Sequence, residues 1–502
     1  MSAHSDRRLF LQSAALGVGG FAFLDGLPAV AADDAKVNPN LVRLDSDIEP
    51  LVRLLEETPR ERLLEEVGSR VKKGLPYRDV LAALLLAGVR NIQPRPNVGF
   101  KFHAVLVVNS AHLASLAGPD QERWLPIFWA LDQFKSAQAT NEKESGWRMK
   151  SVDESQIPTA RKTREMFVEA MTAWDEPKAD VAAAALARHS TANEAFDLFA
   201  RFGCRDFRDI GHKAIFVANA FRTLQVIGWQ HAEAVFRSLA FALLKRETKE
   251  APTGDAVADR VGFRNIELAR KIGTAWRDGK PNPKITDELL ALLRQGSDAE
   301  AGEKVVSLLN GGTSPQVVWD AVFLGAGELL MRQPGIVGLH TLTTANALRY
   351  AFETVGDDET RKLLLLQATS FLPLFRGAMN ERGKVDTVRI DQLEAPDDPG
   401  KCTVESIFQT LNADKMAAAR MTIAYLAGNP NGGRSLIDAG RLLVALKGTD
   451  AHDYKFSTAI MEDYGHISPE RRNSFLAASM FWLKGSSGPD SPLVKRIRAS
   501  LA

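Results

Sequence analysis

Apolar residues recur every three or four positions along most of this chain, with charged residues between them. Leu51, Leu54 and Leu55 begin the pattern, and Leu63 and Val67 continue it. This period places apolar side chains on one face of an α-helix. No run of alternating β-branched residues predicts a sheet. The pattern therefore predicts an all-α fold of about eighteen short helices, packed as a large multi-helix array or bundle.

Gly and Pro residues, which end helices, separate the helical segments. The segments with helical periodicity span residues 51–55, 63–71, 77–91, 99–117, 121–135, 161–174, 180–201, 207–226, 231–247, 258–275, 285–294, 300–310, 315–332, 340–354, 358–374, 404–411, 413–427, 433–447, 453–464, 469–483 and 491–501. Two polar stretches, 136–158 and 382–401, predict surface loops or boundaries. We expect an N-terminal helical region over residues 32–250 and a C-terminal one over 251–502, or one continuous helical domain.

The first 31 residues have the pattern of an export signal. Arg7 and Arg8 precede Leu-Phe-Leu, an apolar stretch containing Gly follows over residues 13–24, and Ala29-Val30-Ala31 forms a cleavage site. This arrangement resembles a twin-arginine (Tat) signal peptide. We therefore predict a Tat-type signal over residues 1–31, the Tat export machinery as a partner, and a soluble product that is periplasmic or secreted.

Charge and cysteine content exclude several classes of protein. The chain has 63 basic and 62 acidic residues and a formal net charge of +1, with no basic cluster, so nucleic acid is not expected as a partner. No apolar run after residue 32 reaches the roughly 18 residues that a membrane-spanning helix needs. With Cys204 and Cys402 alone, a disulfide scaffold is excluded. One bond between them and two buried thiols both remain open.

Three apolar helical segments carry a similar set of polar residues. Each begins near a His and has an Asn six or seven residues later, and the pairs are His103 with Asn109, His212 with Asn219, and His340 with Asn346. Buried polar groups need partners, so the recurrence indicates polar groups aimed at one interior place. Alternatively, each His bonds a neighbouring group and each Asn ties adjacent helices together.

Imidazole is a good ligand for iron, copper and zinc, so one of these transition metals is the candidate cofactor. No His-Glu-x-x-His or Glu-x-x-His motif occurs, and a metal site must therefore be assembled from different helices. We take His103, His212 and His340, with a carboxylate, as the candidate metal ligands. The three asparagines are the candidates for orienting them.

Four further histidines, His112, His231, His452 and His466, lie in or beside helical segments. His112 follows His103 by nine residues, or roughly 900° around a straight helix, so the two face opposite ways unless the helix breaks between them. His231 lies at a helix start after Gly228. His452 lies in the stretch 450–455, Asp-Ala-His-Asp-Tyr-Lys, which is either the edge of an active site or a solvated helix start with Asp450 as N-cap.

Several of these histidines lie in segments with recognisable short motifs. Residues 97–118 contain Gly-Phe-x-x-His with His112 after it, residues 338–350 contain Leu-His-x-x-Thr, and residues 211–226 begin Gly-His-Lys. These segments resemble the questin-oxidase-like family. The resemblance implies a large all-α fold and oxidative ring cleavage of polyketide aromatics, of Baeyer–Villiger type. It also implies a small apolar or aromatic molecule as partner. The catalytic positions that it implies are His103, His112, His212 and His340.

The sequence thus supports two interpretations of the function. The first is an exported oxidoreductase with an interior histidine cluster, which predicts that His103, His212 and His340 converge on one cavity. The second is a non-enzymatic, helical-repeat-like binding or scaffold protein of the periplasm, which predicts scattered histidines and an extended concave surface.

Overall fold

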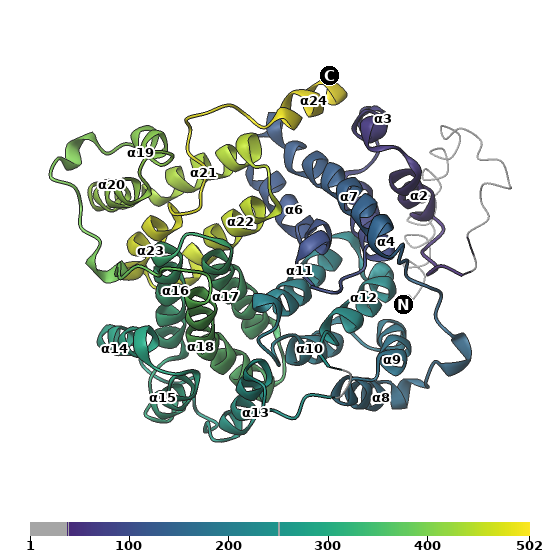
Figure 1. Cartoon of the computed structure of the whole chain (residues 1–502), viewed down its shortest axis with the longest axis horizontal. Helices are drawn as coiled ribbons and strands as arrows, with labels where there is room; N and C mark the ends of the chain where they lie inside the picture. Colours follow the sequence, from purple (N-terminus) through teal and green to yellow (C-terminus); the bar gives the residue numbers. More distant parts are fainter. Residues whose placement is uncertain (1–37, 39, 249–250) are drawn as a thin grey trace, which may run out of the picture.

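The computed structural model describes residues 38, 40–248 and 251–502, and the predicted signal peptide lies outside these residues. Within this part of the chain, 23 α-helices pack together and no β-strand occurs (Figure 1). The prediction of an all-α fold is confirmed. The number of helices exceeds the predicted eighteen.

The helices of the first half are α2 (Glu49–Glu57), α3 (Arg60–Lys72), α4 (Tyr77–Asn91), α5 (His103–Leu106), α6 (Val108–Ala117), α7 (Leu125–Glu144), α8 (Ala160–Ala173), α9 (Glu176–His189), α10 (Ala192–Gly203), α11 (His212–Ile227) and α12 (Ala232–Leu243). Those of the second half are α13 (Val257–Arg270), α14 (Pro283–Gln295), α15 (Asp298–Asn310), α16 (Pro315–Arg332), α17 (Ile336–Thr354), α18 (Asp358–Asn380), α19 (Val404–Thr410), α20 (Lys415–Gly428), α21 (Gly433–Lys447), α22 (Ala451–His466), α23 (Arg472–Ser479) and α24 (Pro492–Leu501). Single turns of 3₁₀ helix are η2 (Phe100–Phe102), η3 (Asp120–Glu122), η4 (Glu154–Gln156), η5 (Asp209–Gly211), η6 (Trp229–His231), η7 (Ile390–Gln392), η8 (Pro399–Lys401) and η9 (Pro469–Arg471).

Two of the extra helices arise where one periodic segment is divided in two. The segment 180–201 becomes α9 and α10 because Thr191 caps α10: its hydroxyl accepts from the Glu194 N–H, and the Glu194 carboxylate accepts from the Thr191 N–H. The segment 99–117 divides at Val107, between α5 and α6. Apolar periodicity continues across both divisions, so it does not reveal them.

One predicted loop is partly helical. Residues 136–144, which we expected to be irregular because they are polar, continue α7 to Glu144. The reason is that some of these polar side chains are buried and bonded. Asn141, for example, accepts from the Gln93 N–H and donates to the Trp147 carbonyl. A polar helix face is thus stabilised by the loops packed on it.

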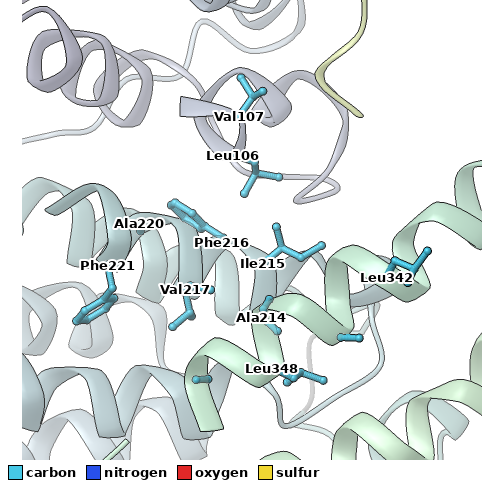
Figure 2. Packing of buried hydrophobic residues seen from close by; sticks show 14 of the residues in the cluster. Leu106, Val107, Ala214, Ile215, Phe216, Val217, Ala220, Phe221, Leu342 and Leu348 are labelled. Carbon is cyan, nitrogen blue, oxygen red and sulfur yellow. The ribbon is translucent and has the colours of Figure 1, made fainter. Parts of the chain in front are cut away.

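A single hydrophobic cluster extends from Val42 to Ile497 and includes residues of both predicted regions. Helix α11 lies inside it. Figure 2 shows Phe216 and Ile215 of this helix near Leu106 on one side, with Leu342 and Leu348 of α17 nearby. Burial of this apolar surface is the main force that holds the helices together.

Four helices form a closed ring at the centre of the molecule, which we call the central ring. Helix α11 contacts α6 and α17, and α22 likewise contacts both α6 and α17 (Figure 1). Helix α5, directly before α6, also contacts α11. Helices α11, α17 and α22 each carry one of the histidines noted in the sequence, close to the N-terminal end of the helix.

The last helix returns to the first part of the chain, because α24 packs against α3 and α7. Arg496 pairs with Glu65 at 2.8 Å, and Arg498 pairs with Glu122.

Cys204 and Cys402 are both buried free thiols. No helix in the described ranges combines the length and the apolar character that crossing a membrane requires.

Candidate metal centre

Four histidines from four different helices meet at one end of the central ring. His103 begins α5, His212 begins α11, His340 lies early in α17, and His452 is the second residue of α22. One ring nitrogen of each lies within 4.8 Å of those of the others. The Nε2 atoms of His103 and His452 are 2.8 Å apart, those of His212 and His340 are 3.0 Å apart, and those of His103 and His212 are 3.3 Å apart. The three histidines expected to share a cavity therefore converge, and His452 joins them.

Hydrogen bonds at the opposite ring nitrogens fix the tautomers. Nδ1 of His103 lies 2.7 Å from the Phe100 carbonyl oxygen, and Nδ1 of His340 lies 2.5 Å from that of Ile336. Nδ1 of His212 bonds the carbonyl of Asp209. A carbonyl oxygen can only accept, so each of these Nδ1 atoms carries the hydrogen. The Nε2 atoms that face one another therefore carry lone pairs.

The fourth histidine is oriented by a carboxylate. Asp450 is the N-cap of α22 and accepts from the His452 N–H at 2.8 Å, and the same oxygen also bonds the Nδ1 of His452. Asp450 is therefore the N-cap that the sequence predicts. The helix start is not solvated, because Asp453, Tyr454 and Lys455 are buried and Asp450 contacts the cluster. The hydrogen bond from His452 lowers the pKa of Asp450 to about 2. A carboxylate behind an imidazole is the usual support of a metal-binding histidine.

Burial keeps the cluster unprotonated. His340 is fully buried and His212 is 4% exposed, while His103 and His452 reach the cavity described below. Desolvation lowers the pKa of His103, His212 and His340 well below the ordinary value, and the nearby positive charge of Lys455 lowers it further. Neutral imidazole is the form that binds a metal ion.

The backbone before His212 adopts an unusual conformation. Asp209, Ile210 and Gly211 all have positive φ angles, of 49°, 48° and 84°. Left-handed backbone is unfavourable for a β-branched residue such as Ile, and such strain persists only where the surroundings hold it. At Gly211 a side chain is excluded twice, by the φ angle and because a Cβ would overlap the side chain of Thr344.

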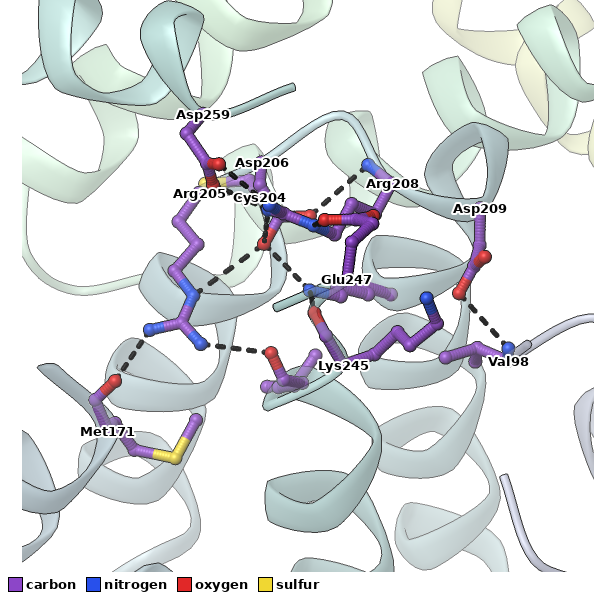
Figure 3. Close-up of polar contacts among 12 residues, drawn as sticks. Val98, Met171, Cys204, Arg205, Asp206, Arg208, Asp209, Lys245, Glu247 and Asp259 are labelled. Carbon is purple, nitrogen blue, oxygen red and sulfur yellow. Dashed lines mark hydrogen bonds and ion pairs between the residues drawn. The ribbon is translucent and has the colours of Figure 1, made fainter. Parts of the chain in front are cut away.

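A buried network of ion pairs holds this strained segment in place (Figure 3). Asp206 pairs with Lys213 at 2.7 Å, and Arg208 pairs with Asp259. Asp209 accepts from the Val98 N–H at 3.1 Å, which ties the segment to the chain before His103. The network therefore fixes the start of α11, and with it the Nε2 of His212.

The cluster lies at the inner wall of a cavity of about 910 Å³. This volume is in the range of pockets for small molecules. Apolar parts of the wall come from Phe100, Phe207, Ile210 and Ile336, and polar parts include Asp209, Glu144 and Gln133. Gly99 closes the wall directly over the histidines, since a Cβ there would lie 3.1 Å from the rings of both His103 and His212.

Comparison with known proteins finds no matching family model, no matching curated protein and no matching solved structure. A function for this chain must therefore be argued from the geometry of its own site.

Two histidines from the sequence prediction lie elsewhere. His112 bonds Tyr77 through Nδ1 at 3.0 Å, between α6 and α4, and is not part of the cluster. The catalytic position implied for His112 therefore does not lie with those of His103, His212 and His340. The division at Val107 does not turn His112 toward His103, so the nine-residue spacing leaves it facing away. His231 lies 3.3 Å from Asp45, also away from the cluster.

The three asparagines do not orient the histidines. Asn219 donates to the Leu106 carbonyl at 2.9 Å, and Asn109 donates to Asn219 at 3.5 Å. Asn346 accepts from Arg222 and donates to Asp463 at 3.0 Å. They line a separate, smaller pocket inside the central ring. Backbone carbonyls and Asp450 bond the histidines instead.

Lys455, which the sequence analysis included only as part of the stretch 450–455 and gave no role of its own, also lines this smaller pocket. Lys455 is 3% exposed, and its ammonium has no hydrogen-bond partner among the described residues. Burial lowers its pKa to about 7. The signal in the sequence is its position three residues after His452, on the same face of α22.

Proposed function

We propose that this protein binds one transition-metal ion through His103, His212, His340 and His452, and uses it as an oxidoreductase acting on a small organic molecule in the adjoining cavity. The observation that carries the proposal is the arrangement of the Nε2 atoms, whose lone pairs point toward one another at 2.8 to 3.3 Å. Such lone pairs repel unless a proton or a cation lies between them. The depressed pKa values disfavour the proton, and so favour a metal ion.

The spacing of the nitrogens is close to that of a metal site: the His103–His212 separation of 3.3 Å matches it, and the two separations of 2.8 and 3.0 Å should widen when an ion binds. Two nitrogens on a tetrahedral ion are about 3.3 Å apart when each bond is roughly 2.0–2.1 Å long. Neutral nitrogen ligands suit iron, copper and zinc. Four protein ligands complete the tetrahedral shell of a zinc ion, whereas iron and copper accept further ligands. Because the histidines line an open cavity, we favour iron or copper, with remaining positions that face the cavity.

The chain's own residues then have distinct tasks. The four imidazoles hold the ion, and Asp450 orients the ring of His452. Phe100, Phe207 and Ile336 provide an apolar wall for an apolar or aromatic substrate. When bound, iron or copper supplies one-electron chemistry and polarises an oxygen ligand. The resemblance to questin-oxidase-like proteins supports an oxidative reaction, since three of its four implied positions are proposed ligands here.

Export through the Tat pathway is part of the proposal. Because that pathway passes folded proteins, the metal can be inserted in the cytoplasm before export. Fusion of residues 1–31 to a reporter tests this step. Export that stops when Arg7 and Arg8 are both replaced by Lys supports it, and export that continues contradicts it.

The metal is tested by elemental analysis of protein purified without chelators. We expect about one iron or copper ion per chain, and X-ray absorption that shows four imidazole nitrogens in the first coordination shell. Metal-free protein should also take up one equivalent of the same ion. If neither the purified nor the reconstituted protein holds iron or copper, the proposed oxidoreductase fails. Zinc alone would leave a metal site without one-electron chemistry.

Replacing Asp450 with Ala should weaken metal binding about 10–100-fold, as loss of an outer-shell partner does. The substitution frees the ring of His452 and also removes a helix cap. Asp357→Ala is the matched control, because Asp357 is likewise an N-cap, of α18, and accepts from the Thr360 N–H. Each variant should lose about 0.5–2 kcal/mol of stability. Only the Asp450 variant should bind metal more weakly in a competition assay with a chromogenic chelator.

A further inference from the structure

The interior of the central ring remains polar beyond the histidines. Thr343 follows His340 by three residues, and Lys455 follows His452 by three. Residues at this spacing lie on the same face of a helix. Both line the smaller pocket, together with Asn109 and Asn219. This pocket therefore lies one helical turn further along α17 and α22 than the histidine cluster.

Two buried polar atoms in this pocket have no partner. Neither the Lys455 Nζ nor the Thr343 Oγ1 makes a hydrogen bond within the described part of the chain, and the two residues are 3% and 4% exposed. An isolated ammonium is costly to bury, and an unbonded hydroxyl adds to the cost. A ligand that accepts hydrogen bonds would satisfy both atoms.

The charges in the pocket favour an anion as that ligand. The carboxylate of Glu462 is engaged by Arg222 at 2.7 Å and by Asn346 at 2.8 Å. Arg222 and Glu462 therefore balance each other, and protonated Lys455 leaves one positive charge over in the pocket. Because the pKa of Lys455 is about 7, this form is partly populated near neutral pH, and a bound anion would favour it. The Lys455 ammonium has no hydrogen-bond partner among the described residues, and the Asp450 carboxylate, which also favours the charged form, already bonds His452.

The size of the pocket restricts the anion. The volume of the pocket is about 10 Å³, which is close to the minimum that holds one water molecule. Tetrahedral oxyanions such as sulfate are much larger than a water molecule and do not fit. A monatomic halide is only slightly larger than water, so small shifts of the lining side chains would admit it. A halide accepts hydrogen bonds from all directions, which suits the ammonium of Lys455 and the hydroxyl of Thr343.

We propose that the smaller pocket of the central ring is a binding site for one halide-sized monoanion, with Lys455 as its counter-charge and Thr343 as a further donor. The site does not require a metal. Its consequence for the metal rests on the proposed function: an anion here offsets part of the charge of an ion held by four neutral imidazoles, so each should favour binding of the other.

The position of the anion is tested with bromide, whose anomalous scattering identifies it in crystals of the wild-type protein soaked in sodium bromide. We expect one bromide peak within hydrogen-bonding distance of the Lys455 Nζ. A peak that appears only on the protein surface, or density that scatters as water at Lys455, would overturn the proposal. This measurement needs no variant, so it stays decisive if a substitution prevents folding.

Thermal unfolding tests the same site in solution, with chloride replaced by sulfate at constant ionic strength. Replacing sulfate with chloride removes the general stabilisation that sulfate provides, so site binding is read from the difference between proteins. The Tm of the wild type relative to that of Lys455→Met should rise with chloride and reach a plateau as the site fills. Lys455→Met should abolish the chloride-specific shift. Lys135→Met is the matched control: Lys135 is also buried, but its ammonium already donates to the carbonyls of Leu55 and Glu56. A chloride shift of equal size in both variants contradicts the assignment.

The two proposals fail separately. Metal content is measured directly, whereas halide binding is measured on metal-free and metal-loaded protein in parallel. A protein that binds bromide at Lys455 but no metal removes the proposed function and leaves the anion site. A protein that binds metal but shows neither a bromide peak nor a chloride-specific shift removes the anion site alone.

Discussion

Replacing His212 with Ala should release the metal from the protein, and this is the largest change that we expect from any single substitution. The Nε2 of His212 lies within 3.3 Å of that of His103 and 3.0 Å of that of His340, so it joins two neighbours in the cluster. Loss of an outer-shell partner costs about 10–100-fold in affinity, and loss of a ligand should cost at least about 100-fold. Elemental analysis of the purified variant measures the result.

His112→Ala is the control for this experiment. His112 is also a buried histidine and loses a hydrogen bond, to Tyr77, when replaced. It should lose roughly 1 kcal/mol or more of stability and keep its metal. Should both variants retain the metal, or both lose it, the assignment of the ligands is wrong.

The second large effect is expected at Gly211. Replacing it with Ala forces a side chain into left-handed backbone, at about 1–2 kcal/mol, and into the side chain of Thr344, where overpacking costs about 1–3 kcal/mol. We expect a loss of about 2–5 kcal/mol in the free energy of unfolding of the metal-free protein. Because Gly211 directly precedes His212, metal affinity should fall as well. Urea denaturation of the metal-free protein measures the first effect.

Gly312 offers a control with the same backbone strain and no steric overlap. Its φ angle is +80°, close to the +84° of Gly211, and a Cβ there would meet no atom within 4 Å. Gly312→Ala should therefore cost only the backbone contribution, about 1–2 kcal/mol. Equal losses in the two variants would show that Thr344 does not restrict Gly211 as the structure indicates.

The fold class could be predicted from the sequence because helical periodicity is a local property. Helix boundaries could be predicted less well. The division between α9 and α10 depends on a capping box at Thr191, within a run that is apolar on both sides. The extension of α7 to Glu144 depends on partners such as Gln93 that are distant in sequence. Side-chain hydrogen bonds determine both of these helix boundaries. The spacing of apolar residues contains no information about such bonds.

Part of the site could also be predicted. His212 and His340 lie in apolar helices, which offer them few hydrogen-bond partners. A shared location in the interior was therefore expected, and the two rings do lie together. The participation of His452 could not be decided, since Asp450 serves as an N-cap whether or not the next turn is buried. The left-handed backbone at Asp209 and Ile210 could not be predicted, because Asp adopts it only occasionally and Ile, which is β-branched, disfavours it. It depends on the ion pairs of Asp206 and Arg208.

The four proposed ligands are distributed widely along the chain, and this affects when the site can form. His103 and His452 are separated by 349 positions. At a translation rate of about 5–20 residues per second, the ribosome needs roughly 17–70 s to synthesise the chain between them. Until His452 has been synthesised, the other imidazoles lack the fourth ligand, and α22 has not completed the central ring. Metal insertion should therefore follow the release of a nearly complete polypeptide, and a nascent chain stalled before residue 452 should bind the ion weakly.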